Sequence, residues 1–166
     1  LKTKAHSNPK LEQLIITNEA LEFYAMVLPN LGASIQEFRI AGHSILDGMR
    51  LTKAGITDYH TKFQSAVLFP FVGRIPQRHY QHNEKIIKLH CNGDQGKTAI
   101  HGHIYNQDFM LTSAQLDEKE AKIEFSYTDK GNTEGYPFPY TIKLVYAFSK
   151  NGVSMSFQVT NTGESS

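Results

Sequence analysis

Apolar residues recur at every second position along most of the chain. Two runs of this kind are residues 21–27 and 122–127, whose apolar positions are Leu21, Phe23, Ala25, Val27, Ile123, Phe125 and Tyr127. A period of two places successive side chains on opposite faces of a strand. No segment has the apolar pattern of an amphipathic helix of three turns, and Gly and Asn separate the runs. The sequence therefore predicts an all-β fold, an antiparallel β-sandwich or a barrel of many short strands.

The pair Asn151-Gly152 separates two of these runs and predicts a β-hairpin with a type I′ turn. With a loop of these two residues, Lys150 lies opposite Val153. The further pairs are Phe148 with Met155, Tyr146 with Phe157, and Leu144 with Val159. The apolar side chains of both strands then share one face, so the register agrees with the hydrophobic pattern.

Length and composition exclude several classes of protein. With 166 residues, 40% of them hydrophobic, the chain is long enough for one domain with a real core. Its 17 basic and 16 acidic residues give a formal charge of +1, which argues against binding to nucleic acid. One cysteine, Cys91, excludes an internal disulfide framework and any zinc site made of cysteines alone. No apolar stretch approaches the roughly 18 residues of a membrane span.

The N-terminal segment is polar over residues 1–10 and lacks the apolar stretch of a signal peptide. Together with the single cysteine, this favours a cytoplasmic location. The chain does not begin with Met, and we expect that it has been trimmed at this end.

Two segments interrupt the alternation and hold the candidate functional residues. Residues 66–72 (AVLFPFV) are continuously apolar and contain Pro70, which predicts an edge, a bulge or an irregular buried loop. They lead directly into Gly73 and Arg74. The second segment, residues 92–108, is a polar loop that contains His101-Gly102-His103. Loops that rest on a rigid sheet are frequent locations of functional sites.

Arg74 has two interpretations. Because it follows a glycine and an apolar run, it suits the floor of a pocket, where its planar group would bind hydroxyl or carboxylate oxygens. It equally suits an ion pair at the rim of a sheet, with Asp47 or Asp58 as the partner. Local pattern alone favours the ion pair, since most arginines are surface residues.

His101 also has more than one interpretation. An imidazole beside a glycine in a loop suits acid–base chemistry near neutral pH, but it equally suits capping of backbone groups. His101 and His103 together form a His-x-His pair, which two-histidine edges of metal sites use. His79, His82 or His90 would complete a metal cluster only if the fold brought them close. We assign no metal.

Four segments, in this order, resemble the aldose 1-epimerase (galactose mutarotase) family. The first is residues 28–33 (LPNLGA), and the second is Gly73-Arg74-Ile75 followed by Tyr80. The third, residues 99–102 (AIHG), is similar to the family's Leu-His-Gly segment, and the fourth, residues 134–137 (EGYP), to its Glu-Gly-Tyr-Pro segment. The resemblance spans most of the chain, from about Leu14 to the end.

The resemblance implies a galactose mutarotase-like supersandwich that interconverts the α and β anomers of a free monosaccharide without a cofactor. It implies that Arg74 is a substrate-binding residue and that His101 is catalytic, the first of two active-site histidines. The family's second histidine follows an Asn-Thr-Gly stretch, and its glutamate base lies later still. Here Asn161-Thr162-Gly163 is followed only by residues 164–166, so neither residue is assigned.

We therefore expect residues 1–166 to be the N-terminal portion of a single aldose 1-epimerase-like domain, with little or no epimerase activity of its own. The alternative is a non-catalytic carbohydrate-binding module on the same scaffold, and a histidine-bound metal protein is the third hypothesis. Exposed strand edges would favour dimerisation or aggregation, so we expect a monomer or a homodimer.

Overall fold

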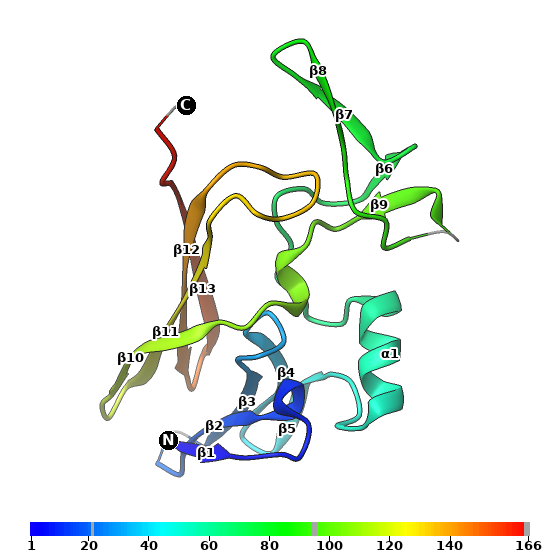
Figure 1. Ribbon diagram of the computed structural model, residues 1–166. Coiled ribbons are helices and arrows are strands. Elements are labelled where there is room, and N and C mark those ends of the chain that lie inside the picture. The colour runs from blue at the N-terminus through cyan, green and yellow to red at the C-terminus, as the bar shows by residue number, and fades with distance from the viewer. Residues whose placement is uncertain (21, 94–95, 165–166) are drawn as a thin grey trace.

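The computed structural model describes residues 1–20, 22–93 and 96–164 and consists mainly of antiparallel strands. Leu21, and Ser165 and Ser166 at the end of the sequence, lie outside the described residues. The first sheet has five strands, paired in chain order (Figure 1). They are β1 (Lys2–Lys4), β2 (Gln13–Asn18), β3 (Phe23–Leu28), β4 (Ser34–Ile40) and β5 (His43–Asp47).

The second sheet has four strands, which also pair in chain order. They are β10 (Met110–Leu116), β11 (Glu120–Asp129), β12 (Tyr140–Ser149) and β13 (Gly152–Asn161). In the sequence between β5 and β10, the chain forms two short ladders. They are β6 (Arg74–Pro76) with β9 (Thr98–Ile100) and β7 (His79–His82) with β8 (Lys85–Lys88). Figure 1 shows these ladders at one end of the molecule, away from the β1–β5 sheet.

The main core lies between the two large sheets. Alternate residues of β3 and β4 pack against alternate residues of β11 and β12, among them Phe23, Ala25, Phe38, Ile123, Phe125, Leu144 and Phe148. The hydroxyl of Tyr146 donates a hydrogen bond to the carbonyl oxygen of Ala33 over 2.9 Å, which satisfies a buried polar pair between the sheets. The predicted antiparallel β-sandwich is confirmed.

A helix that the sequence did not predict contributes to a second buried cluster beside the first sheet. The helix α1 (Lys53–Lys62) begins at Thr52, whose side chain accepts from the backbone N–H of Gly55, and ends at Phe63 in the left-handed conformation. Within it only Gly55 and Tyr59 are buried, so its apolar signal is weak. Tyr59 belongs to a second buried cluster, with Leu11, Leu28, Leu31, Met49 and Tyr105. No helix in the described ranges has the length and apolar character to cross a bilayer.

The predicted hairpin exists, but its register is wrong by two positions. Ser149 lies opposite Gly152 and Phe148 opposite Val153, so the two-residue loop is Lys150-Asn151. The hydroxyl of Ser149 accepts from the backbone N–H of Asn151 (3.2 Å) and donates to the carbonyl oxygen of Gly152 (3.4 Å). A shift of two keeps the same residues on each face, so the predicted apolar face is correct.

The apolar segment 66–72 is an irregular loop, as one of the sequence interpretations has it. Val67 is buried in the main core. Phe69 forms an isolated bridge with Gly102, and the bond between Phe69 and Pro70 is cis. This loop therefore carries the chain from α1 to the segment that contains Arg74.

Candidate active site

The ladder between β6 and β9 brings Arg74 and His101 together. Arg74 pairs with Ile100, and the backbone N–H of His101 continues the ladder by donating to the carbonyl oxygen of Gly73 over 3.0 Å. The two segments that carry the predicted site residues are therefore adjacent strands. Arg74 is exposed and His101 is half-buried beside it.

The backbone of His101 and Gly102 is in the left-handed region, with φ of 61° and 71°. Such a φ is uncommon for a residue with a side chain and is frequent at functional sites. A Cβ atom on Gly102 would lie 1.9 Å from the carbonyl oxygen of Phe69, so only glycine fits there. The next residue, His103, donates its N–H to the same carbonyl oxygen over 3.0 Å. The turn that presents His101 is thus fixed against the loop 66–72.

The imidazole of His101 is held by one backbone group and one aromatic ring. The N–H of Gly73 donates to its Nδ1 over 3.1 Å, and the ring of Phe63 packs edge-on with its centroid at 4.7 Å. Because Nδ1 accepts this hydrogen bond, the proton of the neutral imidazole resides on Nε2. Partial burial, and then the charge of Arg74, lower the pKa of His101 below 6.5. The ring is therefore a neutral hydrogen-bond donor at pH 7.

The surroundings of Arg74 bear on its two interpretations. Its guanidinium carries a permanent positive charge close enough to His101 to disfavour protonation of that ring. Of the two carboxylates proposed as ion-pair partners, Asp58 pairs with Lys62 of the same helix over 3.2 Å.

His103 lies in a different environment from His101. Its Nε2 atom is 2.7 Å from the hydroxyl of Tyr140 and 3.6 Å from a carboxylate oxygen of Asp129. Burial lowers the pKa of His103, while Asp129 opposes this shift in part. The ring of Tyr136 also packs against it, with the centroids 5.6 Å apart. His103 thus joins the site loop to β11 and β12 and acts as a half-buried anchor.

Asp129 organises the loop that follows β11. Its carboxylate accepts from the backbone N–H of Gly131 (2.8 Å), and from the hydroxyl of Thr133. The loop then reaches Gly135, where a Cβ atom would lie 2.4 Å from the carbonyl oxygen of Lys88. The hydroxyl of Tyr80 donates to the carbonyl oxygen of Gly135 over 3.0 Å. The segment 134–137 therefore packs against the β7–β8 hairpin.

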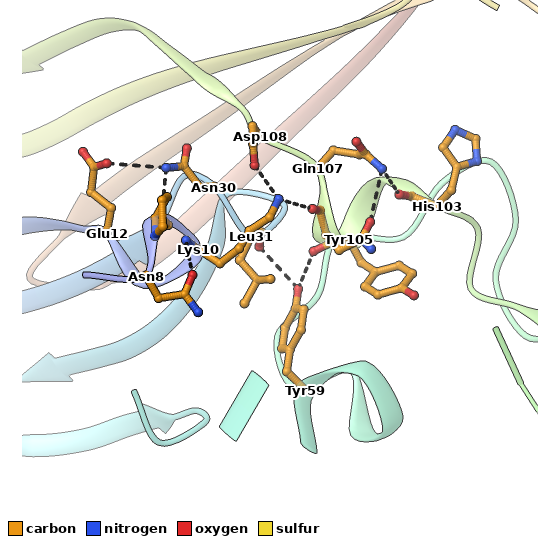
Figure 2. A network of polar contacts seen from close by, with 12 residues as sticks. Asn8, Lys10, Glu12, Asn30, Leu31, Tyr59, His103, Tyr105, Gln107 and Asp108 are labelled. Atoms are coloured by element: carbon orange, nitrogen blue, oxygen red, sulfur yellow. Dashed lines mark hydrogen bonds and ion pairs between the residues drawn. The ribbon is translucent and has the colours of Figure 1, made fainter. Parts of the chain in front are cut away.

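The far end of the site loop is anchored to the N-terminal region (Figure 2). The ammonium of Lys10 donates to the carbonyl oxygen of Asn106 over 2.7 Å and forms an ion pair with Asp108. The hydroxyl of the buried Tyr59 lies 2.9 Å from the carbonyl oxygen of Tyr105 and 3.4 Å from that of Leu31. Residues 101–109 thus contact α1, the first sheet and the N-terminal 3₁₀ turn Pro9–Leu11.

A cavity of about 330 Å³ lies beside this loop, and its lining does not include Arg74 or His101. Polar groups of Asn92, His103, Gln107 and Glu134 line it. The side-chain amide of Asn92 donates to the carbonyl oxygen of Ile100 over 2.8 Å and accepts from its N–H over 2.7 Å. Asn92 therefore supports β9. Outside this lining, Arg74 is exposed and His101 is half-buried.

In the part of the chain that the structure describes, the histidines do not converge on a common point. His101 and His103 have different partners, and His90 forms a pair with Glu134 over 3.1 Å. Among residues 1–20, 22–93 and 96–164, no group of three or more His, Cys, Asp or Glu is placed to hold a metal ion. The His-x-His pattern is accounted for by one histidine beside Arg74 and one that anchors the loop.

Sequence reasoning missed two residues that shape the site. Phe63 packs on His101 but follows a helix that the pattern did not reveal. Asp129 lies at the end of a long strand, and its signal is the following Gly131-Asn132, typical of a turn closed by an aspartate side chain. That signal identifies a turn, but the contact between Asp129 and His103 depends on the tertiary fold.

Comparison with known proteins identifies relatives of this fold. The model of the aldose 1-epimerase family matches residues 13–166. A galactose mutarotase-like protein from Clostridium acetobutylicum is 22% identical with a TM-score of 0.78, over 96% of this chain and 48% of that one. Galactose 1-epimerase from Lactobacillus acidophilus is 18% identical with a TM-score of 0.68, over 90% and 44%. No curated protein matches the sequence.

A third similar structure, a putative aldose 1-epimerase from Escherichia coli, is 17% identical with a TM-score of 0.64, over 91% of this chain and 47% of that one. The chain thus spans about half the length of these solved structures. They share its fold, and the family match covers all but the first twelve residues. The chain belongs to the aldose 1-epimerase family.

Proposed function

We propose that the protein binds a free aldose at Arg74 and His101 and takes part in interconverting its α and β anomers. The observation that carries this proposal is the hydrogen bond from Gly73 to Nδ1 of His101, which leaves Nε2–H as the donor of the neutral ring. The family supplies the class of substrate, a sugar, and the class of reaction, an isomerisation.

The reaction needs two proton transfers. A base removes the proton of the anomeric hydroxyl, the bond between C1 and the ring oxygen breaks, and C1 becomes a carbonyl. The ring oxygen takes up a proton as it leaves. Rotation about C1–C2 and the reverse steps then give the other anomer. A positioned acid or base contributes about 10²–10⁴-fold to such a step.

His101 suits the side of the ring oxygen. Because its neutral imidazole donates from Nε2, it stabilises the negative charge that grows on that oxygen when the C1–O bond breaks. The neutral ring is a poor proton donor. Nδ1 accepts from Gly73, and the lowered pKa of His101 disfavours the protonated form that could deliver a proton. We therefore assign it a role in charge stabilisation and leave the proton donor to another group.

Arg74 suits the binding of sugar hydroxyls. Its guanidinium presents several donors in a fixed plane, which fits two neighbouring hydroxyl oxygens. Its charge also stabilises the partial negative charge of the opened ring. Placing it next to His101 in the ladder lets both residues address the same ring.

We expect this polypeptide to bind a sugar without catalysing its mutarotation. Its residues place one imidazole and one guanidinium on an open surface, and the chain spans about half the length of similar structures. We expect it to bind an aldose weakly and to show a mutarotation rate near the uncatalysed value. Full turnover, which the family implies, is proposed only for a protein that spans the whole length of these structures.

The test is a sugar titration followed by NMR, with the anomer exchange rate measured on the same samples. Arg74→Ala and His101→Ala should each weaken binding by about tenfold, equivalent to the loss of one or two good hydrogen bonds. Arg50→Ala and His43→Ala, which change exposed residues of the same types, are the matched controls. Unchanged binding in both site variants contradicts the proposal.

A second candidate is carbohydrate binding without catalysis, and one cavity favours it. This cavity of about 450 Å³ combines aromatic rings with amides, as sugar-binding surfaces do; its lining includes Tyr80, Tyr136, Phe138, Tyr140, Asn83 and Asn161. In that case Phe138→Ala should abolish sugar binding, while Arg74→Ala should leave it intact.

A further inference from the structure

Asp129 is a buried carboxylate that the proposed reaction does not use. It ends β11, and its side chain is 4% exposed. One carboxylate oxygen accepts from the backbone N–H groups of Gly131 and Asn132 over 2.8 and 3.3 Å. The other accepts from the hydroxyl of Thr133 and lies 3.6 Å from Nε2 of His103. Burial of a carboxylate is costly, so each of these donors helps to keep Asp129 in place.

The ring of His103 contacts both Asp129 and Tyr140. These two residues are opposite each other in the ladder of β11 and β12, so their side chains lie on the same face of the sheet. Nε2 of His103 is 2.7 Å from the hydroxyl of Tyr140. A carboxylate only accepts hydrogen bonds and a hydroxyl can accept one, so a proton on Nε2 suits both neighbours. His103 is thus held as a donor to the second sheet.

Only Gly102 separates His103 from His101, and the turn they form needs support from outside. His101 and Gly102 both have a positive φ, which persists in a residue with a side chain only where the surrounding structure holds it. On one side the N–H of Gly73 donates to the ring of His101. On the other side the backbone N–H of His103 donates to the carbonyl oxygen of Phe69, and its ring reaches the second sheet.

We propose that Asp129 and His103 are positioning residues for His101, and that they keep its turn in the conformation in which Nδ1 meets the N–H of Gly73. Neither residue contacts the sugar in this proposal, because both act on the ring of His101 through the backbone of Gly102. The value of this ring for a ligand rests on the proposed function. The positioning itself needs no sugar.

The same carboxylate serves a second segment of the candidate site. By closing the turn after β11, Asp129 also directs residues 134–137, which pack against the β7–β8 hairpin. Two segments that are far apart in sequence, 99–102 and 134–137, therefore depend on one buried group. A buried ionic group often costs more than an apolar side chain of the same size, and a role in fixing two segments at once accounts for it here.

The test follows the ring of His101 in samples without sugar. Nitrogen–proton correlation NMR reports whether Nδ1 accepts a hydrogen bond, and amide exchange reports how often the N–H of Gly73 is released. Asp129→Asn keeps an oxygen for Gly131, but it turns an NH₂ group toward Nε2–H of His103, so that two donors face each other. We expect the amide of Gly73 to exchange about tenfold faster and the Nδ1 signal to move toward that of a free ring.

Asp117→Asn is the matched control. Asp117 closes an exposed turn in the same way, by accepting from the backbone N–H groups of Lys119 (2.7 Å) and Glu120 (2.9 Å). This turn precedes β11, whereas Asp129 ends that strand. The control should leave the Nδ1 signal and the exchange of Gly73 unchanged.

A second pair of variants tests His103. His103→Leu removes the donor and should have the same effect as Asp129→Asn, whereas His103→Gln supplies a side-chain N–H donor and should restore part of the native behaviour. His90→Leu is the control, since His90 lines the same cavity and pairs with Glu134 of the neighbouring segment. Equal behaviour of His103→Leu and His90→Leu contradicts the proposal.

A merely structural role gives a different result. The amides of Ile123 and Leu144 lie in the main core, and their exchange measures global unfolding on the same samples. If Asp129→Asn accelerates exchange in the core but leaves the Nδ1 signal of the folded protein in place, the proposal is overturned. Should Asp129→Asn fail to fold, Tyr140→Phe removes one hydroxyl from the same network and is judged by the same signals.

A sugar titration of these variants separates this proposal from the proposed function. Weaker sugar binding by Asp129→Asn, together with a moved Nδ1 signal, supports both. A moved signal in a protein whose native form binds no sugar supports the positioning and contradicts the proposed function. An unmoved signal contradicts the positioning, whatever the sugar affinity is.

Discussion

The backbone N–H of Gly73 donates a hydrogen bond to Nδ1 of His101 over 3.1 Å, and this single contact determines which nitrogen of the imidazole can meet a ligand. We predict that His101 is neutral at pH 7 with its proton on Nε2. Nitrogen–proton correlation NMR distinguishes the two neutral forms directly, and the His101→Gln spectrum identifies the signal. A proton on Nδ1 contradicts the assigned role in stabilising charge at the ring oxygen.

Gly102 is the position in the site loop where a substitution should cost most. Gly102→Ala introduces a side chain at positive φ and a contact of 1.9 Å with Phe69, and we expect a loss of unfolding free energy of at least about 2 kcal/mol. Gly42→Ala is the control: its φ of 76° is similar, but its Cβ meets no atom within 4 Å. Its cost should be about 1 kcal/mol. Urea unfolding of both variants measures the difference, and equal losses would assign the whole effect to backbone strain.

Acidification should destabilise the protein. Burial lowers the pKa of His103 in the folded state below its ordinary value of 6.5, so the unfolded chain binds more protons over the pH range between the two values. Above about pH 6.5, His103 is neutral in both states and the free energy of unfolding is at its full value. Stability is lost as the pH falls below 6.5. His101 and His60, whose pKa values burial also lowers, act in the same direction.

His103→Gln tests this pH dependence. The melting temperature of the native protein should fall between about pH 7.5 and 5.5, and the variant should show a smaller fall. His43→Gln changes an exposed histidine and should follow the native curve. A His103→Gln curve parallel to the native one would show that His103 takes no part in the pH response.

Tyr146 is the buried hydrogen-bond donor between the sheets, and its hydroxyl should be worth a measurable part of the stability. Tyr146→Phe leaves the carbonyl oxygen of Ala33 without this donor in the core, and we expect a loss of about 1–2 kcal/mol. Tyr24→Phe, at a half-buried position of β3, should cost less than about 0.5 kcal/mol. Chemical denaturation of the pair gives both values, and a neutral Tyr146→Phe would argue that water reaches Ala33.

The pattern of the sequence determines the sandwich and its apolar faces, but not every register. For the hairpin of β12 and β13, the alternation identifies which residues share a face, and that prediction is confirmed. It cannot separate registers that differ by two, since both keep the same face. The choice is made locally, where the Ser149 hydroxyl bonds to Asn151 and Gly152, and Gly152 takes a φ of 141° at the start of β13.

Helix α1 shows a different limit. Its buried side consists of Gly55 and Tyr59, too few for a helical period, and the helix is supported by its cap at Thr52 and by contacts of Tyr59 that come from distant segments. The periodicity of apolar residues cannot predict a helix that is stabilised by tertiary contacts of this kind.

The proximity of Arg74 and His101 is predicted by family resemblance and not by their spacing. Their separation in sequence is compatible with many folds, and only the ladder of β6 with β9 makes them neighbours. Their proposed roles stay predictions until sugar binding is measured. The contact between Asp129 and His103 lies beyond both kinds of reasoning, because it joins the end of β11 to a loop that reaches it only in the folded protein.

The anchoring of the site loop by Lys10 has a consequence for biosynthesis. Lys10 reaches Asn106 and Asp108 across 96 and 98 positions of sequence. A ribosome makes the 3₁₀ turn Pro9–Leu11 early, yet its docking partner emerges only after nearly a hundred further residues. Contacts of such long range close slowly, so this turn stays undocked until those residues have emerged, and the loop bearing His101 gains this anchor only then.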